Sequence, residues 1–409
     1  MCKALIFAGL LLFSSLSWSE FAWDASGFGT LAAGKLNRDH LMLMDYDDSW
    51  SFKSDSVLGV QLLAEFNNTF SITSQILAKG FTFDDTSSFE PEFEWLFLSY
   101  QMGESTRARV GRLRTPFFLF SETLDVGYSQ PWVRPPVDVY AFLLEPFSAF
   151  NGVDLQTTFL LDSSELDFQI FFGQAEGEFA GYDIEVEPML GLNATWHKSE
   201  FMLRYGFLLL ENNIENPQLR PLVQGFEQAS VFSPEFQEIS EQFYIDDGVF
   251  HYHILGAQWE HKTWSVIYEH FFLVAKDDGF SNDSRGWYIS LANRWGEFTP
   301  YVVIGRYVSI TNSKAQKLIQ NSYNTVPAGF NAGLDALRQT GAFVAEQFNA
   351  KERTYTVGMR WDFLTNTDVK IEYQYFELLK GSTGNLFPLP GAERPENVAL
   401  FSISLDVVF

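Results

Sequence analysis

The 409-residue sequence has a single cysteine, Cys2, which lies at the extreme N-terminus. Once that segment is removed, disulfides and thiol chemistry are excluded. Beyond residue 19 no apolar run reaches the roughly 20 residues that a membrane-spanning helix needs. Basic residues are also scarce, since 27 Lys and Arg stand against 52 Asp and Glu. The formal charge of −25 argues against a nucleic-acid partner, whose phosphates need a basic surface.

The N-terminus has the pattern of a secretory signal peptide. A short basic start precedes an apolar run from Ala4 to Phe13, and the small residues Ser17 and Ser19 follow it. About ten apolar residues are too few to cross roughly 30 Å of hydrocarbon, which weakens the alternative of a membrane anchor. We expect residues 1–19 to be a signal peptide cleaved after Ser19 and residues 20–409 to form one domain.

The sequence is rich in aromatic residues and in segments where apolar and polar residues alternate. Phe, Tyr and Trp make up 17% of the chain, a composition typical of the aromatic girdles of lipid-facing barrels. Apolar and polar residues alternate in many segments of about ten residues, as in spanning strands with one face on lipid and the other toward the lumen. In the last segment one face carries Phe401, Ile403, Leu405, Val407 and Phe409, and the other carries Ser402, Ser404 and Asp406.

Sixteen such segments are found, and an even number is what a closed bacterial barrel requires. We predict strands at 26–38, 56–68, 70–82, 90–102, 106–116, 150–162, 165–176, 187–197, 199–211, 250–261, 263–275, 285–295, 298–310, 352–365, 368–379 and 397–409. The connections alternate between short ones and longer ones, including 117–149, 212–249, 311–351 and 380–396. This asymmetry predicts an all-β fold, a transmembrane antiparallel β-barrel with short periplasmic turns and long extracellular loops.

The end of the chain and the third long loop carry a resemblance to a known family. Phe409, with apolar residues at every second position before it, resembles the C-terminal signature that the barrel-assembly machinery reads in outer-membrane proteins. Strand count, loop alternation and terminal Phe together resemble the sixteen-stranded Gram-negative porins over almost the whole mature chain. In those porins the third long loop folds into the lumen, and here that loop is 117–149, entered through the Gly-Arg-x-x-x-Pro stretch from Gly111 to Pro116. The apolar, proline-rich 131–136 segment departs from the general-diffusion pattern and leaves open a narrower, more selective pore.

The resemblance implies a location in the cell outer membrane and a water-filled channel for passive diffusion of ions and small hydrophilic solutes. It also implies homotrimers and no cofactor. The expected partners are the lipid bilayer and lipopolysaccharide, which acidic loops can contact through bridging divalent cations. The solute and the choice between anions and cations stay open, because the chain is acidic but its predicted lumen contains many arginines.

Candidate pore-lining residues begin with a basic cluster on one predicted strand. A barrel of sixteen strands is too wide for its side chains to fill, so lumen-facing residues are expected to meet water and to set ion preference. The cluster consists of Arg107, Arg109, Arg112 and Arg114. Arg107 and Arg109 fall on one face of the strand, and Arg112 and Arg114 fall on the other. A bulge at Gly111 would turn all four side chains inward. Alternatively, the first pair lies in the periplasmic turn.

Further candidates come from strands distant in sequence. Arg204, Arg294, Arg306, Arg360 and Lys370 fall on predicted inward faces. They resemble the basic ladder that porins set across the lumen from acidic loop residues, and the third loop offers Glu122, Asp125, Asp138 and Glu145 beside Arg134. The alternative is that the arginines pair with wall carboxylates such as Glu94, Asp154, Asp167 or Glu372. Likewise Tyr128, Trp132 and Tyr140 form either an aromatic track for a solute or ordinary packing of the loop.

Other activities have weaker support in the sequence. His251 and His253 share a strand face, as zinc ligands can, but aromatic neighbours favour a place in the girdle. No serine motif has a histidine partner placed for hydrolysis, so we do not expect an enzyme. A siderophore-type receptor needs a plug domain of more than a hundred residues and about 22 strands. The first predicted strand begins almost directly after the predicted signal peptide, so we do not expect a receptor of this class. An adhesin, receptor or scaffold that acts through its outer loops stays open as the alternative, and residues 332–348 have the pattern of an amphipathic helix in one such loop.

Overall fold

The structure is a computed structural model of the whole chain. It describes residues 21–39, 41–82, 87–141, 148–179, 181–275, 283–310, 314–346, 350–379, 382, 384–385, 387–388 and 395–409. The predicted signal peptide and Glu145 of the third long loop lie outside the described residues.

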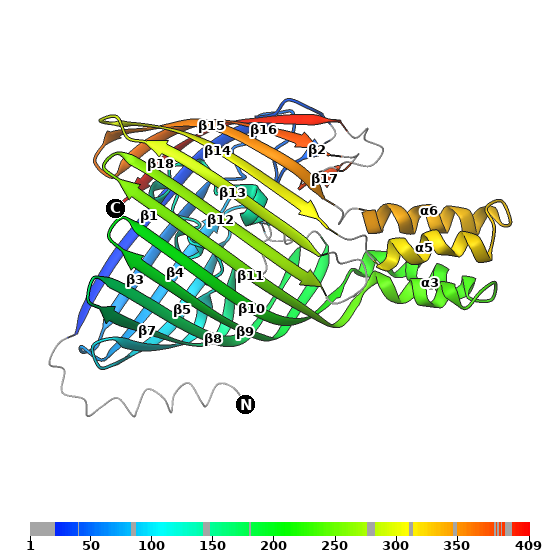
Figure 1. The fold of residues 1–409 in the computed structure, drawn as a ribbon, viewed down its shortest axis with the longest axis horizontal. Coiled ribbons are helices and arrows are strands. Elements are labelled where there is room, and N and C mark those ends of the chain that lie inside the picture. Colours follow the sequence, from blue (N-terminus) through cyan, green and yellow to red (C-terminus); the bar gives the residue numbers. More distant parts are fainter. Residues whose placement is uncertain are drawn as a thin grey trace.

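Sixteen antiparallel strands close into one barrel, because β1 pairs with β3 on one side and with β18 on the other (Figure 1). The strands are β1 (Ala22–Leu36), β3 (Val57–Glu65), β4 (Phe70–Lys79), β5 (Pro91–Met102), β6 (Thr106–Arg114), β7 (Ala149–Leu161), β8 (Ser164–Phe179), β9 (Tyr182–Lys198), β10 (Phe201–Glu215), β11 (Ile245–His261), β12 (Trp264–Ala275), β13 (Ser284–Asn293), β14 (Phe298–Ser309), β15 (Lys351–Leu364), β16 (Thr367–Leu378) and β18 (Asn397–Val408). The short β2 (Leu41–Met42) and β17 (Phe387–Pro388) pair with each other outside the barrel sheet. The predicted sixteen-stranded barrel is confirmed.

The strand lengths differ from the prediction on one side of the barrel. The strands from β8 to β11 have 15 to 17 residues. β8 ends at Phe179, and β9 begins at Tyr182. The predicted loop between 176 and 187 is therefore mostly strand. Short connections lie at one end of the barrel, the turn end, and the longer ones at the other, the loop end (Figure 1).

The outer face of the barrel is apolar for the reason that the sequence pattern predicted. Leu405 of β18, Ile371 of β16 and Val357 of β15 have side chains 40%, 47% and 55% exposed, and their sequence neighbours point inward. A soluble protein seldom exposes so continuous an apolar belt, whereas a membrane barrel requires one. None of the described helices is long and apolar enough to cross a membrane.

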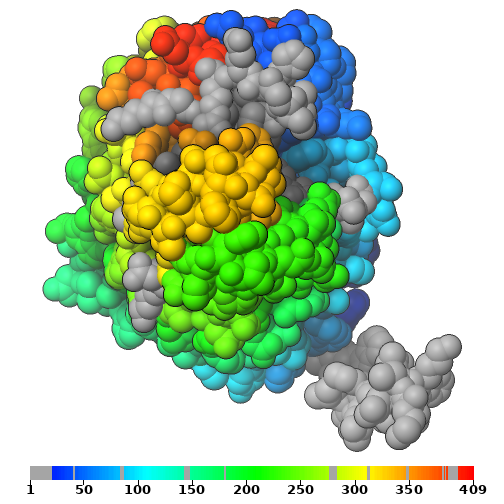
Figure 2. All heavy atoms as spheres, turned by 90° about the vertical axis from the view of Figure 1, so that its right-hand side faces the viewer, coloured from blue at the N-terminus to red at the C-terminus, as the bar shows by residue number. Residues whose placement is uncertain are grey.

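Helices project from the loop end and have a core of their own (Figure 1). They are α3 (Arg220–Ala229), α4 (Glu235–Ser240), α5 (Lys314–Thr325) and α6 (Ala332–Glu346), with the 3-10 turns η5 (Pro217–Leu219) and η6 (Glu241–Phe243). We call α3 to α6 the helical module. The predicted helix at 332–348 is confirmed as α6. Arg338 of α6 is buried and donates to the carbonyl oxygens of Ser322 and Val326, at 2.9 and 2.8 Å. Seen from the loop end, the helical module lies over the middle of the barrel (Figure 2).

Candidate functional site: loop 3 inside the barrel

The connection between β6 and β7 lies inside the barrel and is the centre of the candidate site. We call residues 115–148 loop 3; its described part contains η2 (Ser121–Thr123), η3 (Gly127–Ser129) and α2 (Val137–Tyr140). Its entry is fixed by Arg114, the last residue of β6, which forms an ion pair with Glu94 on β5. The same guanidinium lies 2.6 Å from Asp125 and donates to the carbonyl oxygen of Ser121 at 2.8 Å. These contacts turn the chain inward directly after the strand.

Arg134 holds the far side of loop 3 against the wall. Its guanidinium lies 2.7 Å from Asp55, in the connection after β1, and 3.2 Å from Glu372 of β16. It also donates to the hydroxyl oxygen of Ser402 on β18 at 2.6 Å and lies over the ring of Tyr46. Burial alone would lower the pKa of Arg134, but Asp55 and the other neighbouring anions raise it above its ordinary value. The side chain is therefore a permanent cation joining the loop to two elements of the wall.

Two further wall cations bind backbone carbonyl groups of loop 3. Lys370 of β16 donates to the carbonyl oxygen of Gly127 at 2.6 Å, and Arg360 of β15 donates to those of Tyr128 and Gln130 at 2.6 and 3.0 Å. The approach is close enough to need glycine, since a Cβ at residue 127 would collide with Asp406 and Thr30. The inner face of β15, β16 and β18, which holds loop 3 by these contacts, is called the polar half.

Asp138 of α2 is a buried carboxyl group at the point where loop 3 crosses β13 to β15. Its Oδ2 accepts a hydrogen bond from Thr354 of β15, while its Oδ1 has no partner among the described residues. Gly286 and Gly305 leave room for the Asp138 backbone and side chain to approach the wall. Burial raises the pKa of Asp138 well above its ordinary value, and the nearby carboxylate of Glu352 raises it further.

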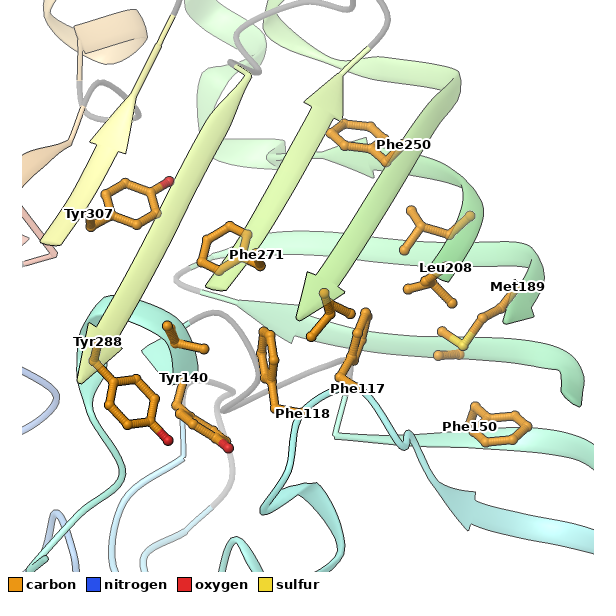
Figure 3. Close-up of a cluster of buried hydrophobic side chains, with 14 of the residues drawn as sticks. Phe117, Phe118, Tyr140, Phe150, Met189, Leu208, Phe250, Phe271, Tyr288 and Tyr307 are labelled. Atoms are coloured by element: carbon orange, nitrogen blue, oxygen red, sulfur yellow. The ribbon is translucent and has the colours of Figure 1, made fainter. Parts of the chain in front are cut away.

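The opposite side of loop 3 is apolar. Figure 3 shows Phe117, Phe118 and Tyr140 of the loop among the rings of Phe271 and Tyr288. The centroid of the Phe118 ring lies 5.1 Å from that of Tyr140 and 6.1 Å from that of Phe271. The inner face of β10 to β13, which is lined here by buried apolar residues, is called the apolar half. Loop 3 thus forms a core with the wall, as in a soluble protein.

One acidic residue is set into this apolar surface. Glu269 of β12 accepts hydrogen bonds at 2.6 Å from the hydroxyls of both Tyr140 and Tyr288. It also accepts one at 2.7 Å from the backbone N–H of Leu119. Glu269 therefore fixes the position of two separate parts of loop 3, because a buried carboxyl group is stable only when its oxygens are paired.

Cavities remain on both sides of loop 3. One of about 100 Å³ lies against β1, β3 and β4 and is lined by Thr30, Asp55, Lys79, Asp125 and Arg134 among others. Another of about 390 Å³ lies toward the turn end of β6 to β10 and is lined by Arg107, Glu122, Gln169, Asn193 and Arg204 among others. Charged side chains line part of both cavities, in contrast to the packed apolar half between the strands and the loop.

The basic cluster on β6 is divided by the barrel wall. Arg109 is buried and paired with Asp154 at 2.5 Å, Arg114 is buried as described, and Arg107 is exposed beside Gln156. Arg112 points outward: it is paired with the lipid-facing Leu96, and its Nε donates to the carbonyl oxygen of Phe93. The prediction that a bulge at Gly111 turns all four arginines inward is wrong for Arg112, because the register of β6 continues unbroken through Gly111. Arg114, at the end of the strand, is instead held inward by Glu94 and Asp125.

The candidates from other strands are also divided. Arg204, Arg360 and Lys370 face inward, and Arg204 donates to the carbonyl oxygen of Pro116 at 2.6 Å. The placement of Arg306 on the inner wall is wrong, because it shares the outer face of β14 with the exposed Ile304. Arg294 was also placed wrongly, since it is exposed in the connection after β13.

The acidic residues of loop 3 touch their basic partners. Glu122 lies 3.6 Å from Arg109, and Asp125 lies 2.6 Å from Arg114. The expectation of a basic ladder set across the lumen from the acidic loop residues is therefore wrong for these described groups. The water exposure expected of lumen-facing residues is likewise wrong for Lys370, which is 0% exposed. The alternative holds instead, in which arginines pair with Glu94, Asp154 and Glu372 of the wall.

The aromatic and histidine candidates have structural places. Trp132 is 1% exposed and its indole N–H donates to Ser290 at 3.0 Å, which is packing of loop 3 against β13. Tyr128 lies under the guanidinium of Arg360 at 4.6 Å. His251 and His253 lie on the outer face beside the ring of Phe207. The described part of the chain holds no cluster of three or more potential metal ligands.

Sequence reasoning missed Asp55 and Glu269 as anchors of loop 3. Asp55 lies in the first long loop and Glu269 is a lone acid in an aromatic strand, so neither belongs to a motif. The one available signal for Glu269 is a carboxyl group whose nearest neighbours on the inner face of the strand, Ile267 and Phe271, are apolar. For Asp55 we find no signal in the sequence.

Comparison with known proteins gives a result for the fold alone. No protein-family model matches the chain, and no curated protein sequence matches it. Solved structures, however, match its fold. The outer-membrane channel DcaP of Acinetobacter baumannii has a TM-score of 0.54 with 11% identity, covering 96% of this chain and 99% of that one. This chain has the fold of the sixteen-stranded porins.

Two further porins show the same similarity. The anion-selective porin of Comamonas acidovorans has a TM-score of 0.55 at 12% identity and covers 95% of this chain and 100% of its own. OmpF of Salmonella typhi, in a complex with daunomycin, has a TM-score of 0.56 at 10% identity and covers 95% and 97%. The porin fold therefore extends over almost the whole chain.

Proposed function

We propose that the protein is an outer-membrane channel through which ions and small hydrophilic solutes diffuse passively. The observation that carries the proposal is a closed barrel with an apolar outer face whose interior is narrowed by loop 3 and retains cavities beside it that are lined in part by charged side chains. Sixteen strands enclose more space than the wall side chains can fill, so an inserted loop is what sets the width of the passage.

The packing of loop 3 favours a narrow passage. It is anchored to β5, β12, β15, β16 and β18, and it packs against the buried apolar residues of the apolar half. The two cavities beside loop 3 lie against β1, β3 and β4 and against β6 to β10. We expect solutes to pass there, with Lys79, Arg107, Glu122 and Asp125 in contact with them.

Planar-bilayer conductance of the purified protein tests the proposal. Stepwise openings are expected, and their size should increase several-fold in a variant that lacks residues 119–139 of loop 3. The sign of the reversal potential in a salt gradient gives the charge preference. A silent membrane with folded wild-type protein, together with a silent loop-deleted variant, would refute the channel.

The helical module favours one second candidate, a barrel whose outer loops bind a partner. Its buried core, including Phe226, Phe236 and Ile239, makes it a small folded unit rather than a set of loose loops. At its surface Val231 and Phe330 are 81% and 62% exposed. A variant with α5 and α6 replaced by a short linker separates the two functions, since a channel keeps its conductance and a loop-mediated binder loses its partner.

Assembly and targeting belong to the same proposal. Cleavage after Ser19 is expected from the signal-peptide pattern, and contact with lipopolysaccharide is expected from the acidic loops. The resemblance to outer-membrane proteins and porins implies recognition of Phe409 by the barrel-assembly machinery and packing into homotrimers. N-terminal sequencing of the mature protein tests the first. Crosslinking in native membranes tests the last, where a ladder ending at three copies is the expected result.

A further inference from the structure

Two neighbouring rows of outward-facing side chains cross β11 to β16 near the loop end of the barrel. Each row joins directly opposed residues of adjacent strands, so its side chains are neighbours on one face. The row nearer the loops contains His253, Phe272, Arg285, Val308 and Lys351. The other contains His270, Trp287, Arg306, Arg353 and Glu377. We call them the outer basic rows.

The charge of these rows is opposite to that of the chain. They hold four Lys or Arg and one acid, whereas the whole sequence has 27 Lys and Arg against 52 Asp and Glu. Arg353 is paired with Glu377 at 3.3 Å. Among the described residues the side chains of Arg285 and Arg306 have no hydrogen bond or ion pair, and the Nε of Arg306 is buried without a partner.

The position of Arg306 opposite a second arginine also favours a bound anion. Arg306 lies directly opposite Arg353 on the neighbouring strand. Like charges in directly opposed positions are destabilising, and water at a lipid boundary screens them less than bulk water does. A bound anion between the two guanidinium groups would turn this repulsion into two charge-assisted contacts.

The rows lie at the edge of the apolar belt. The next row toward the turn end consists of Tyr268, Ile289, Ile304, Tyr355 and Tyr375. Tyrosine and aliphatic side chains on the outer face are typical of the interface between hydrocarbon and headgroups. The outer basic rows are one step beyond that interface, toward the loop end, where β11, β14 and β15 connect to the helical module (Figure 1).

We propose that the outer basic rows bind the phosphate groups of an anionic lipid in the outer leaflet, with Arg306 as the central ligand, Arg353 opposite it and Arg285 in the neighbouring row. The inference rests on the proposed location in the outer membrane. Guanidinium groups bind phosphate through two parallel hydrogen bonds, and basic residues beside an apolar wall select phosphate-bearing lipids over neutral ones. A lipid also places its acyl chains on Ile289 and Ile304, which a soluble anion would not use.

The test is a titration of the full-length protein in detergent with lipopolysaccharide and with the same lipid after removal of its phosphates. The bound lipid is counted by native mass spectrometry. We expect the phosphorylated lipid to bind at least about tenfold more tightly, the effect of one to two charge-assisted hydrogen bonds. The variant R285Q/R306Q is expected to lose this preference. Equal binding of the two lipids by wild type, or an unchanged preference in the variant, would overturn the proposal.

A matched variant controls for net charge. K35Q/R112Q removes two cations from the outer face of β1 and β6, away from the rows, and should keep the preference. Equal loss in both variants would mean a general charge effect and overturn the assignment to these rows. The folding of each variant is checked by heat-shifted gel mobility. If R285Q/R306Q does not fold, R306K replaces it, because lysine keeps the charge but loses the two-point geometry of the guanidinium. An undiminished preference in R306K would then overturn the proposal.

Two further readouts separate the possible failures. Inorganic phosphate at the concentration of the lipid should not displace it; displacement would show a site for free anions and overturn the lipid assignment. Bilayer conductance is measured on the same preparations. Phosphate-dependent lipid binding with a silent membrane refutes the channel alone, whereas channel openings without phosphate preference refute this inference alone.

Discussion

The polar and apolar halves of the inner wall hold the same loop by different means. On the polar half, Lys370 and Arg360 bind backbone carbonyl groups of loop 3, and Glu372 binds the loop residue Arg134. On the apolar half, Phe271 and its neighbours pack against Phe118. Directional bonds fix where the loop lies along the barrel, whereas apolar contact supplies area with little preference for position.

The difference has a consequence for how the passage can change. Apolar packing tolerates small shifts, since a ring that moves away from one neighbour can pack against another. A buried ion pair does not, because removal of one partner leaves an uncompensated charge. We therefore expect the polar half to control whether loop 3 is in place, and the apolar half to contribute stability.

The largest expected effect is at Arg134. Arg134→Met leaves the carboxylates of Asp55 and Glu372 without their cation, which should lower the free energy of unfolding by about 4 kcal/mol. Loop 3 should also detach from the polar half and raise single-channel conductance. Urea unfolding followed by tryptophan fluorescence measures the first, and bilayer recordings the second. Arg112→Met, an arginine on the outer face, is the control, and equal losses in both variants would contradict the anchoring role.

A smaller loss of stability is expected on the apolar half. Phe118→Ala removes a ring packed against Tyr140 and Phe271 and should cost about 3 kcal/mol. Because the contacts of the polar half remain, conductance should change little. A conductance increase as large as that of Arg134→Met would show that the two halves do not differ in the way described.

The third effect depends on pH. In the anchored loop the pKa of Asp138 is raised by burial and by Glu352, so the folded site favours the neutral carboxyl group. The contribution of Asp138 to the stability of the anchored loop is complete at acid pH, where its carboxyl group is protonated in both the anchored and the detached loop. This contribution falls as the pH rises beyond the ordinary carboxyl range. Wild-type conductance should therefore increase toward alkaline pH. Asp138→Asn keeps the neutral form, and its conductance should not respond.

The smallest effect concerns charge selectivity. Arg107 is exposed and lines the cavity beside β6 to β10, so Arg107→Ala should shift the reversal potential slightly toward cations. Its stability should change by less than about 0.5 kcal/mol. Arg112→Ala should leave selectivity unchanged, since that side chain is on the outer face. A shift with Arg112→Ala alone would place the passage elsewhere.

The sequence was informative where the two faces of a strand meet different surroundings. In β18, apolar residues face lipid and Ser402, Ser404 and Asp406 face inward, so alternation gave both the strand and its orientation. In β14 the pattern failed, because inward Tyr301 and Val303 are as apolar as outward Val302 and Ile304. The misplacement of Arg306 follows directly from that ambiguity.

Alternation, aromatic content and the order of short and long connections determined the sixteen-stranded barrel, because each strand must meet lipid on one face and each loop must return at the correct end. The sequence by itself also supplied the cations and the apolar rings of loop 3. Which carboxylate meets which cation was decided by the tertiary structure alone. Arg134 and its partner Glu372 are joined only when the barrel closes and the loop crosses it, and no local pattern records a contact between groups 238 residues apart.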